Sequence, residues 1–293
     1  GCPEIETSES KLIIDDNDIC VDVKPRTRGK SEMIIEEFML LANQSSANLA
    51  RKMNIPFVYR VHEVPPIEKV DRLKECLLKL NVEYPQFSEI KPSHMAEILK
   101  SVKGTDKFEL INNIVLRSMA KAKYDKTPIG HFGLALKDYA HFTSPIRRYP
   151  DLAIHRIISD VVQGYDQKYI TKRYESFVQN ASEQSSKMEL VAMNVERSCE
   201  DCYKAEYMKS HVGETFDAII TSVTDFGFYV ELPNTVEGLV HINTLPEDVY
   251  ESDGMFSIIG EFTKRMFTAG DKVSVICTKT DVNSGNIDFE LSK

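Results

Sequence analysis

The order of apolar and polar positions divides the chain into a helical part and a β-rich part. From Glu32 to about Asn54, apolar residues recur every three or four positions, which predicts an amphipathic helix. Similar spacing predicts further helices over 67–80, 92–101, 106–123, 144–162, 167–180 and 183–209.

Residues 11–23 precede these helices and consist of two short apolar runs separated by Asp15-Asp16-Asn17-Asp18. Adjacent carboxylates can bind Mg²⁺, but Asp and Asn between two apolar runs are also typical of a tight turn. We favour the turn, and we therefore predict a β-hairpin here rather than a metal site.

After Val212 the pattern changes to alternation with many β-branched residues and turn residues at short intervals. A final hairpin is predicted around Asn283-Ser284-Gly285-Asn286. Several short strands in so small a segment are typical of a closed barrel of the OB type. We therefore predict an α+β chain, with a mostly helical domain over 1–211 and a five-stranded OB-type barrel over 212–293.

Composition and charge narrow the functional classes. The 293-residue chain carries a net charge of −9, and residues 212–293 hold five Lys or Arg against fourteen Asp or Glu. This acidic balance argues against binding nucleic acid by charge alone, although local basic clefts are compatible with it. No apolar run has the length of a membrane span, the start lacks a signal pattern, and six scattered cysteines suit a reducing compartment. We expect a cytoplasmic protein.

The candidate chemistry centres on "AHFTSPIRRYPD", residues 140–151. Ser144 followed by Pro145 suggests a helix start, which would place Arg147 and Arg148 at the positive end of the helix dipole. Cations there need a compensating anion. Asp151, four residues from Arg147 and three from Arg148, is one candidate, and a bound phosphate is the other. Spacing alone leaves both interpretations open.

Three glutamates are weaker candidates. Glu36 shares a helix face with Asn43, so a carboxylate and an amide could point into one cleft. On spacing alone we favour the simpler interpretation, in which a glutamate at this position complements the helix N-terminus. Glu37 lies next to Glu36 in the same segment. Glu196 lies beside a stripe predicted to be core, and its position is typical of a solvated helix charge. That stripe consists of Met188, Val191, Val195, Cys199 and Cys202.

Three long motifs resemble those of the RNase II/RNase R (RNB) family of 3′-to-5′ exoribonucleases. They are "MIIEEFMLLANQSSANLA" with "PFVYRVHEVPP", "GHFGLALKDYAHFTSPIRRYPDLAIHR", and "VERSCEDCYKAEYM" leading into a segment similar to S1 domains. The resemblance covers essentially the whole chain. It implies part of an RNB catalytic domain followed by an S1 RNA-binding domain of the OB type.

The resemblance also implies residue roles. Arg147 resembles the family arginine that contacts the scissile phosphate, and Glu196 resembles an active-site glutamate near the leaving nucleotide. Glu36 or Glu37 resembles the glutamate that senses a ribose 2′-hydroxyl. The remaining motif residues are expected to brace the site, namely His141, Arg148, Tyr149, Asp151 and His155.

The family's metal motif is missing from this sequence. Its members hold Mg²⁺ through aspartates in a D-P-x-x-A-x-D-x-D-D motif, which does not occur here. Because the resemblance implies hydrolysis by two metal ions, we expect this chain alone to bind RNA with little or no nuclease activity.

In the S1-like segment, Phe226, Phe228 and His241 resemble the exposed aromatic patch that stacks on bases. Since alternate strand positions face the same side, Phe226 and Phe228 are predicted to form one platform, with Tyr229 facing the core. We expect single-stranded RNA as the partner, with neither DNA nor a membrane. Two alternatives are a non-catalytic RNA-binding protein and an S1-type adaptor that binds a ribosome or degradation-machinery protein.

Overall fold

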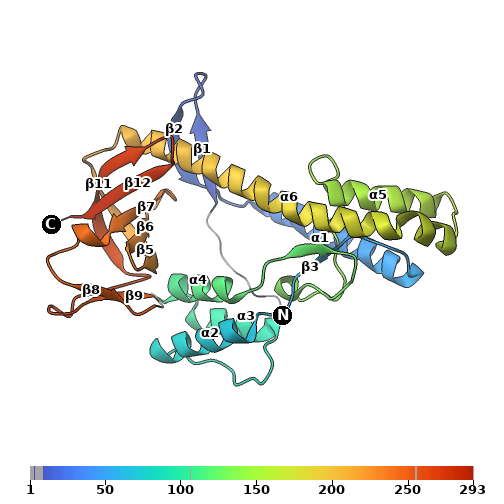
Figure 1. Cartoon of the computed structure of the whole chain (residues 1–293), viewed down its shortest axis with the longest axis horizontal. Helices are drawn as coiled ribbons and strands as arrows, with labels where there is room; N and C mark the ends of the chain where they lie inside the picture. The colour runs from blue at the N-terminus through green and yellow to red at the C-terminus, as the bar shows by residue number, and fades with distance from the viewer. Residues whose placement is uncertain (1–2, 4–8, 106, 255, 293) are drawn as a thin grey trace. The chain divides into compact units, whose positions relative to one another are not determined.

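The computed structural model describes residues 3, 9–105, 107–254 and 256–292, and its helices and strands are labelled in Figure 1. The chain contains two compact units. The first, called the helical unit below, comprises Gly1–Ile5, Arg28–Lys103 and Ile114–Ala192. The second, called the barrel unit, comprises Glu6–Thr27, Gly104–Asn113 and Met193–Lys293.

The helical unit is built mainly from helices around one short pair of strands, β3 and β4, which run antiparallel. Its elements are α1 (Lys30–Met53), β3 (Tyr59–Val61), α2 (Ile67–Lys79), α3 (Pro92–Val102), β4 (Lys123–Asp125), the 3₁₀ turn η1 (Phe132–Leu134) and α5 (Tyr149–Val162). Two helices, α4 (Phe108–Ser118) and α6 (Gln167–Lys209), belong partly to each unit.

The core of the helical unit joins the second half of α1, β3, α5 and the start of α6. Ala47 and Ala50 of α1 and Ile154 of α5 have essentially no exposed surface. Phe57 and Ile170 complete the same cluster from the β3 segment and α6. Each large apolar side chain buried in this way contributes about 1.5–3 kcal/mol, so these contacts fix the position of the residues 140–151 that precede and begin α5.

The first half of α1 lies outside this core. Met33, Ile34, Ile35 and Phe38 are all more than half exposed, although the sequence pattern predicts an amphipathic helix through them. The stripe on α6 behaves in the same way, because Met188, Val191, Val195 and Cys199 are exposed and Cys202 is only partly buried. The prediction that this stripe is core is therefore wrong for the described residues, since no described element covers that face of the helix.

The predicted break between helices at residues 180–183 is also wrong. The structure has a single α6 of 43 residues, visible as one continuous helix in Figure 1. Neither glycine nor proline occurs between 165 and 212, so nothing in the backbone ends the helix there.

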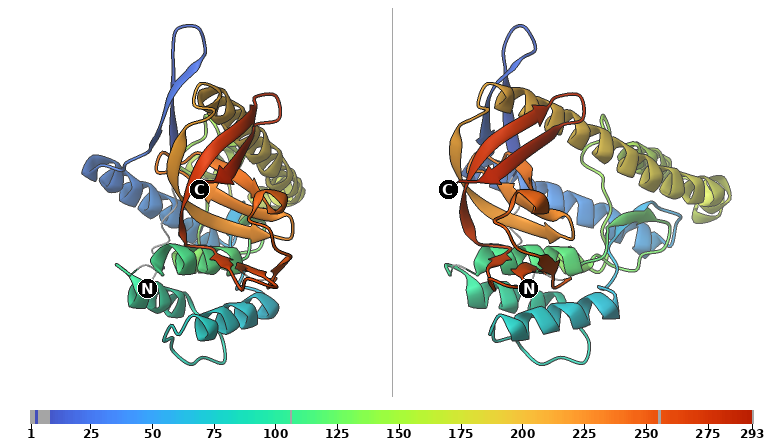
Figure 2. Two further views of the ribbon diagram at one scale, coloured as in Figure 1. Left: turned by 90° about the vertical axis from the view of Figure 1, so that its left-hand side faces the viewer. Right: turned by 60° about the vertical axis from the view of Figure 1, so that its left-hand side comes forward.

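The barrel unit contains the predicted five-stranded closed barrel, in the order β11-β12-β7-β6-β5 (Figure 2). The strands are β5 (Thr215–Thr224), β6 (Gly227–Glu231), β7 (Glu237–His241), β11 (Lys272–Asp281) and β12 (Asn286–Leu291). Only β12 and β7 pair in parallel. The barrel interior is filled by large apolar side chains such as Phe228, Val240 and Phe289, each at most 1% exposed. The α+β fold prediction is confirmed.

Smaller elements complete the barrel unit. They are the hairpin β1 (Ser10–Ile14) and β2 (Cys20–Pro25), the 3₁₀ turn η2 (Ile242–Thr244), and a three-stranded sheet of β8 (Tyr250–Ser252), β9 (Ser257–Gly260) and β10 (Met266–Thr268). In the first hairpin, Asp15 Oδ1 accepts hydrogen bonds from the backbone N–H groups of Asn17 and Ile19, each at 2.9 Å. These bonds lower the pKa of Asp15 and confirm the predicted turn.

The domain boundary predicted at residue 211 falls in the turn between α6 and β5. The division into compact units instead passes through α6, between Ala192 and Met193. The assignment of 1–211 and 212–293 as domains stays a prediction. No helix among the described residues is long and apolar enough to cross a membrane.

Candidate nucleic-acid interface

The two arginines that the sequence places together have different surroundings in the structure. Residues 145–147 form a turn, and α5 begins only at Tyr149, with Arg148 as its N-cap. The prediction of Ser144 as the N-cap is wrong. Pro150 lies in the first helical turn, where a backbone N–H would have no partner within the helix, so its missing N–H costs no hydrogen bond. In the preceding turn, the backbone N–H of Arg148 donates to the Ser144 carbonyl at 3.0 Å.

Arg148 is held by Asp151 and does not project into solvent. Its Nη2 donates to Asp151 Oδ1 at 2.8 Å, and the same oxygen accepts the backbone N–H of Ser144 at 2.8 Å. The Asp151 side chain has no exposed surface, and 20% of the Arg148 side chain is exposed. The spacing does not show which arginine pairs with Asp151. In the structure the carboxylate of Asp151 neutralises the charge of Arg148.

Arg147 lies at the exposed tip of the turn, next to Ile146, whose side chain is fully exposed. Arg147 forms no ion pair with any residue that the structure describes. Its guanidinium is a planar fork of donors, which suits bidentate binding of a phosphate. The geometry thus assigns the anchoring role to Arg148 and leaves the guanidinium of Arg147 available for an anion.

Asn43 on α1 fixes the backbone just before the turn. Its side chain is 4% exposed, and its Oδ1 accepts the backbone N–H groups of Phe142 at 2.8 Å and Thr143 at 3.2 Å. Its Nδ2 donates to the hydroxyl of Tyr139 at 3.1 Å. Sequence reasoning placed Asn43 in a cleft with Glu36 and missed this bracing role, because the partners lie about a hundred residues away in the chain.

Both predicted bracing histidines make internal contacts. His141 Nδ1 hydrogen-bonds the Tyr124 hydroxyl at 3.0 Å, and burial, reinforced by nearby arginine charges, lowers its pKa to about 2. His155 Nε2 hydrogen-bonds the Phe142 carbonyl at 2.9 Å, and its ring stacks on the Phe142 ring at 4.3 Å. The neutral His141 ring therefore supports the turn without adding charge to it.

The remaining candidates of the helical unit are exposed. Tyr149 is 48% exposed at the start of α5. Glu36 lies within 3.6 Å of the Arg28 guanidinium, and both Glu36 and Glu37 lie on the exposed first half of α1. Their exposure does not decide which of them would face a ribose. Glu196 is also exposed, on the part of α6 that belongs to the barrel unit.

In the barrel, the structure corrects one member of the predicted aromatic patch. Phe228 has no exposed surface, and its ring packs on that of Phe267 with 5.2 Å between the ring centroids. Phe226 precedes β6 and lies in the turn, so the alternation that would pair it with Phe228 does not apply. Its ring, 47% exposed, instead meets the edge of the partly exposed Tyr229 at 6.4 Å.

His241 lies on the neighbouring strand of the same face. It pairs with Gly227, the residue next to Phe226, and is partly exposed at the end of β7. Gly227 has a φ of +144°, and a Cβ there would lie 2.2 Å from the Val240 carbonyl oxygen, so only glycine permits this close approach of strands. The accessible aromatic set is thus the exposed Phe226 with the partly exposed Tyr229 and His241, and the prediction that Tyr229 faces the core is wrong.

A metal site is not formed by the residues that the structure describes. Nowhere among them do three His, Cys, Asp or Glu side chains gather closely enough to hold an ion. The Asp15–Asp18 segment is engaged in its own turn. The donor set present therefore does not fit the Mg²⁺ ions that the family resemblance implies.

Comparison with protein families matches two models to this chain. The RNB domain model matches residues 1–164, and the S1 RNA binding domain model matches residues 209–292. The chain belongs to the RNB family. The first match includes α1, the arginine turn and the start of α5, and the second includes the whole five-stranded barrel.

Curated relatives and solved structures agree with this assignment. Ribonuclease R 1 of Lactococcus lactis is 38% identical over 292 residues, covering 99% of this chain but 36% of the relative. Ribonuclease R of Aquifex aeolicus is 39% identical over 99% of this chain and 41% of its own length. Mycoplasma genitalium RNase R, solved in complex with ribose methylated single-stranded RNA, is 27% identical with a TM-score of 0.92, over 100% of this chain and 46% of that one. The chain therefore spans less than half the length of these relatives.

Proposed function

We propose that this chain holds single-stranded RNA for 3′-to-5′ degradation, as part of an RNB-family exoribonuclease that releases nucleoside 5′-monophosphates. The observation that carries the proposal is the exposed guanidinium of Arg147 on a turn fixed from both sides, by Asn43 and by Asp151. A preorganised donor of this kind binds a backbone phosphate without having to order its own loop.

The barrel by itself supplies a separate surface that we propose for binding RNA. Phe226 and Tyr229 offer exposed ring surface on which unpaired bases can stack, at about 1–3 kcal/mol per base. His241 adds a polar edge beside them. The complex of the Mycoplasma genitalium relative with single-stranded RNA supports the choice of this partner.

We further propose that the chain by itself binds RNA without hydrolysing it. The chemistry that bound Mg²⁺ ions would supply in such a hydrolysis is an activated water and a stabilised leaving oxygen. The described residues do not fit such ions, so Arg147 can orient a phosphate but has no activated nucleophile to direct at it. Two further roles are proposed on the family resemblance. Glu196 would act near the leaving nucleotide, and Glu36 or Glu37 would sense a ribose 2′-hydroxyl.

The test is fluorescence anisotropy with a labelled twelve-residue oligoadenylate, titrated with the chain at several salt concentrations in EDTA. Arg147→Gln is expected to weaken binding and to lower the slope of log K against log salt by about 0.7, the loss of one phosphate contact. Arg156→Gln is the matched control, because it removes an equal charge from an exposed position on α5. Equal effects of the two substitutions would contradict a specific phosphate contact at Arg147.

A further inference from the structure

A cluster of exposed tyrosines and cations lies where α5 ends and α6 begins, within the helical unit and outside the arginine turn. Tyr165 is 42% exposed and Tyr169 is 40% exposed. Val162, the last residue of α5, is 80% exposed. The tyrosine patch, as it is named below, consists of Val162, Tyr165, Lys168, Tyr169, Lys172 and Arg173.

The two tyrosine rings of the patch are stacked on each other. Their centroids are 4.4 Å apart, and their planes differ by 16°. The Arg173 guanidinium lies 5.8 Å from the centre of the Tyr169 ring and donates to the Tyr169 hydroxyl at 2.8 Å. A cation and an aromatic ring attract each other in this arrangement. The rings are therefore held in one orientation, although both are exposed.

The backbone beneath the stacked rings is also fixed. Asp166 Oδ1 accepts the backbone N–H of Tyr169 at 2.7 Å, which caps the start of α6. The side chain of Gln167 donates to the Asn54 carbonyl at 2.8 Å. Ile170, on the same turn of α6, has no exposed surface and belongs to the core that includes α5, which lies beside the start of α6 in Figure 1. A flat surface held in this way binds a ligand without having to become ordered first.

The two lysines of the patch lack a compensating charge. Lys168 and Lys172 are exposed and four residues apart on α6, so their side chains are neighbours on one face of the helix. Like charges at this spacing repel each other, and neither lysine forms an ion pair within the part of the chain that the structure describes. Two nearby carboxylates are engaged elsewhere, since Asp160 lies 3.2 Å from Arg173 and Asp166 caps α6. An anion between the two lysines would remove their repulsion.

We propose that the tyrosine patch is a further contact for single-stranded RNA, with one unpaired base stacked on the Tyr165 ring and a backbone phosphate between Lys168 and Lys172. The choice of RNA rests on the proposed function. Exposed aromatic rings beside cations that contact the backbone are the combination with which proteins hold single strands without sequence preference. The unpaired lysines are complementary to phosphate in a chain whose net charge is −9.

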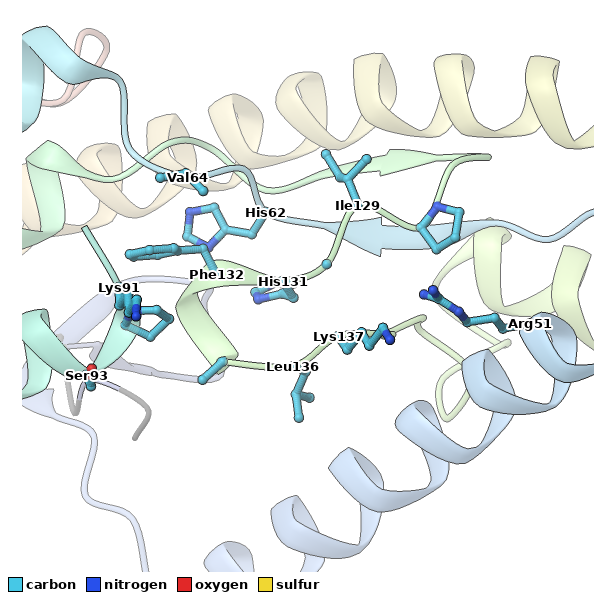
Figure 3. A pocket seen from close by; sticks show the side chains of 14 residues that line it. Arg51, His62, Val64, Lys91, Ser93, Ile129, His131, Phe132, Leu136 and Lys137 are labelled. Carbon is cyan, nitrogen blue, oxygen red and sulfur yellow. The ribbon is translucent and has the colours of Figure 1, made fainter. Parts of the chain in front are cut away.

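A groove elsewhere in the helical unit also contains cations, but they do not converge. In Figure 3, Lys91 and Lys137 lie at opposite ends of this groove, with the Phe132 ring between them. The third cation of the lining, Arg51, pairs with the buried Asp138. No single anion can therefore contact both lysines. Because Lys137 is exposed and outside the tyrosine patch, it serves as a matched control for the loss of one positive charge.

The length of α5 sets the length of RNA that is needed. The helix has 14 residues, with the arginine turn before its start and the tyrosine patch at its end. At 1.5 Å per residue it is about 21 Å long. A stacked strand that rises about 3.4 Å per nucleotide needs about six nucleotides to cover this length. A tetranucleotide bound at Arg147 is therefore too short to reach Tyr165, whereas a twelve-residue oligoadenylate is long enough.

Fluorescence anisotropy of the whole chain with labelled oligoadenylates of four and twelve residues, in EDTA, tests the proposal. Tyr165→Ala is expected to weaken binding of the longer strand at least about fivefold and of the shorter strand less than about twofold. Tyr165→Phe keeps the ring and should bind both strands like the wild type. Lys168→Gln with Lys172→Gln should weaken the longer strand at least about fivefold, and Lys137→Gln less than about twofold. Melting temperatures should not change, because the replaced side chains are exposed.

Two results would overturn the proposal. Unchanged binding of the longer strand by Tyr165→Ala or by the double lysine variant would show that the patch does not hold RNA, and an acidic protein would then be the partner that its charge fits. An equal loss for both strands would show that Tyr165 is not a separate contact. Arg147→Gln distinguishes this from failure of the proposed function, because it should weaken both strands. If Arg147→Gln binds both strands normally while Tyr165→Ala loses the longer one, the site at the arginine turn fails and the tyrosine patch stands.

Discussion

Replacing Asp151 with alanine should destabilise the helical unit more than any other single change at the arginine turn. Its Oδ1 accepts hydrogen bonds from Arg148 Nη2 and from the Ser144 backbone N–H, both at 2.8 Å, and its side chain is fully buried. Removing one partner of a buried ion pair typically costs about 3–5 kcal/mol, because the other charge is left without compensation. Arg148 keeps 20% of its side chain exposed, which places the expected loss at the lower end, about 3 kcal/mol.

The assay is urea unfolding followed by far-UV ellipticity, a signal dominated by the helices. Asp151→Asn keeps an acceptor for Ser144 but loses the charge, so it should cost less, about 1–3 kcal/mol. The control is Asp71→Ala on α2, an exposed carboxylate 3.7 Å from Lys74, which should change stability by less than about 0.5 kcal/mol.

A second comparison isolates the pair itself. Because each single alanine leaves its partner buried and unpaired, Arg148→Ala combined with Asp151→Ala should cost less than the sum of the two single changes. If Asp151→Ala unfolded at the same urea concentration as the Asp71 control, or if the two changes simply added, the structural role of the Arg148–Asp151 pair would be refuted.

The remaining predictions concern pH, the barrel and the exposed helix. His141 has a pKa of about 2 in the folded state, below its unfolded value. Because the unfolded chain then binds one more proton below pH 6.5, the free energy of unfolding should fall by about 1.4 kcal/mol for each pH unit below that value. His141→Gln should remove this one-proton slope in melts between pH 7 and 5. Phe226→Ala and Tyr229→Ala should each weaken oligoadenylate binding about fivefold or more while the melting temperature stays unchanged. Phe228→Ala should instead destabilise the barrel by about 3–5 kcal/mol, as calorimetric melting would show. The exposed apolar face of α1 should cause self-association at high concentration that Phe38→Ser reduces, and a clean monomer on gel filtration would contradict this.

Local patterns predict much of this fold, because the physics that sets them is local. The turn at Asp15, the strands after Val212 and the helix near Ile154 follow from alternation, 3.6-residue spacing and turn chemistry. The sequence pattern places the start of α5 too early because Ser144 has the right chemistry for an N-cap, whereas Asp151 reaches back to take the Ser144 N–H. Local spacing cannot distinguish these two arrangements.

Features that depend on distant parts of the chain are not predictable from the sequence. Asn43 has the pattern of a polar residue on an amphipathic helix, and only the fold shows it bound to the backbone at Phe142. Phe228 and Phe226 look equivalent by alternation, but Phe226 lies in a turn, so the exposed partner is Tyr229. The apolar residues of the α6 stripe have the spacing of a core face. Spacing shows that a helix is amphipathic, but it does not show whether another element packs on its apolar face.

One measurement directly tests whether this chain, as we propose, holds RNA without cleaving it. A homogeneous preparation is incubated with labelled oligoadenylate and Mg²⁺, bound and free strands are separated, and the strand length is read on a denaturing gel. We expect a bound strand that stays at full length. Release of mononucleotides that stops when EDTA is added would contradict RNA binding without cleavage, because that activity would require metal ligands that the described residues do not provide.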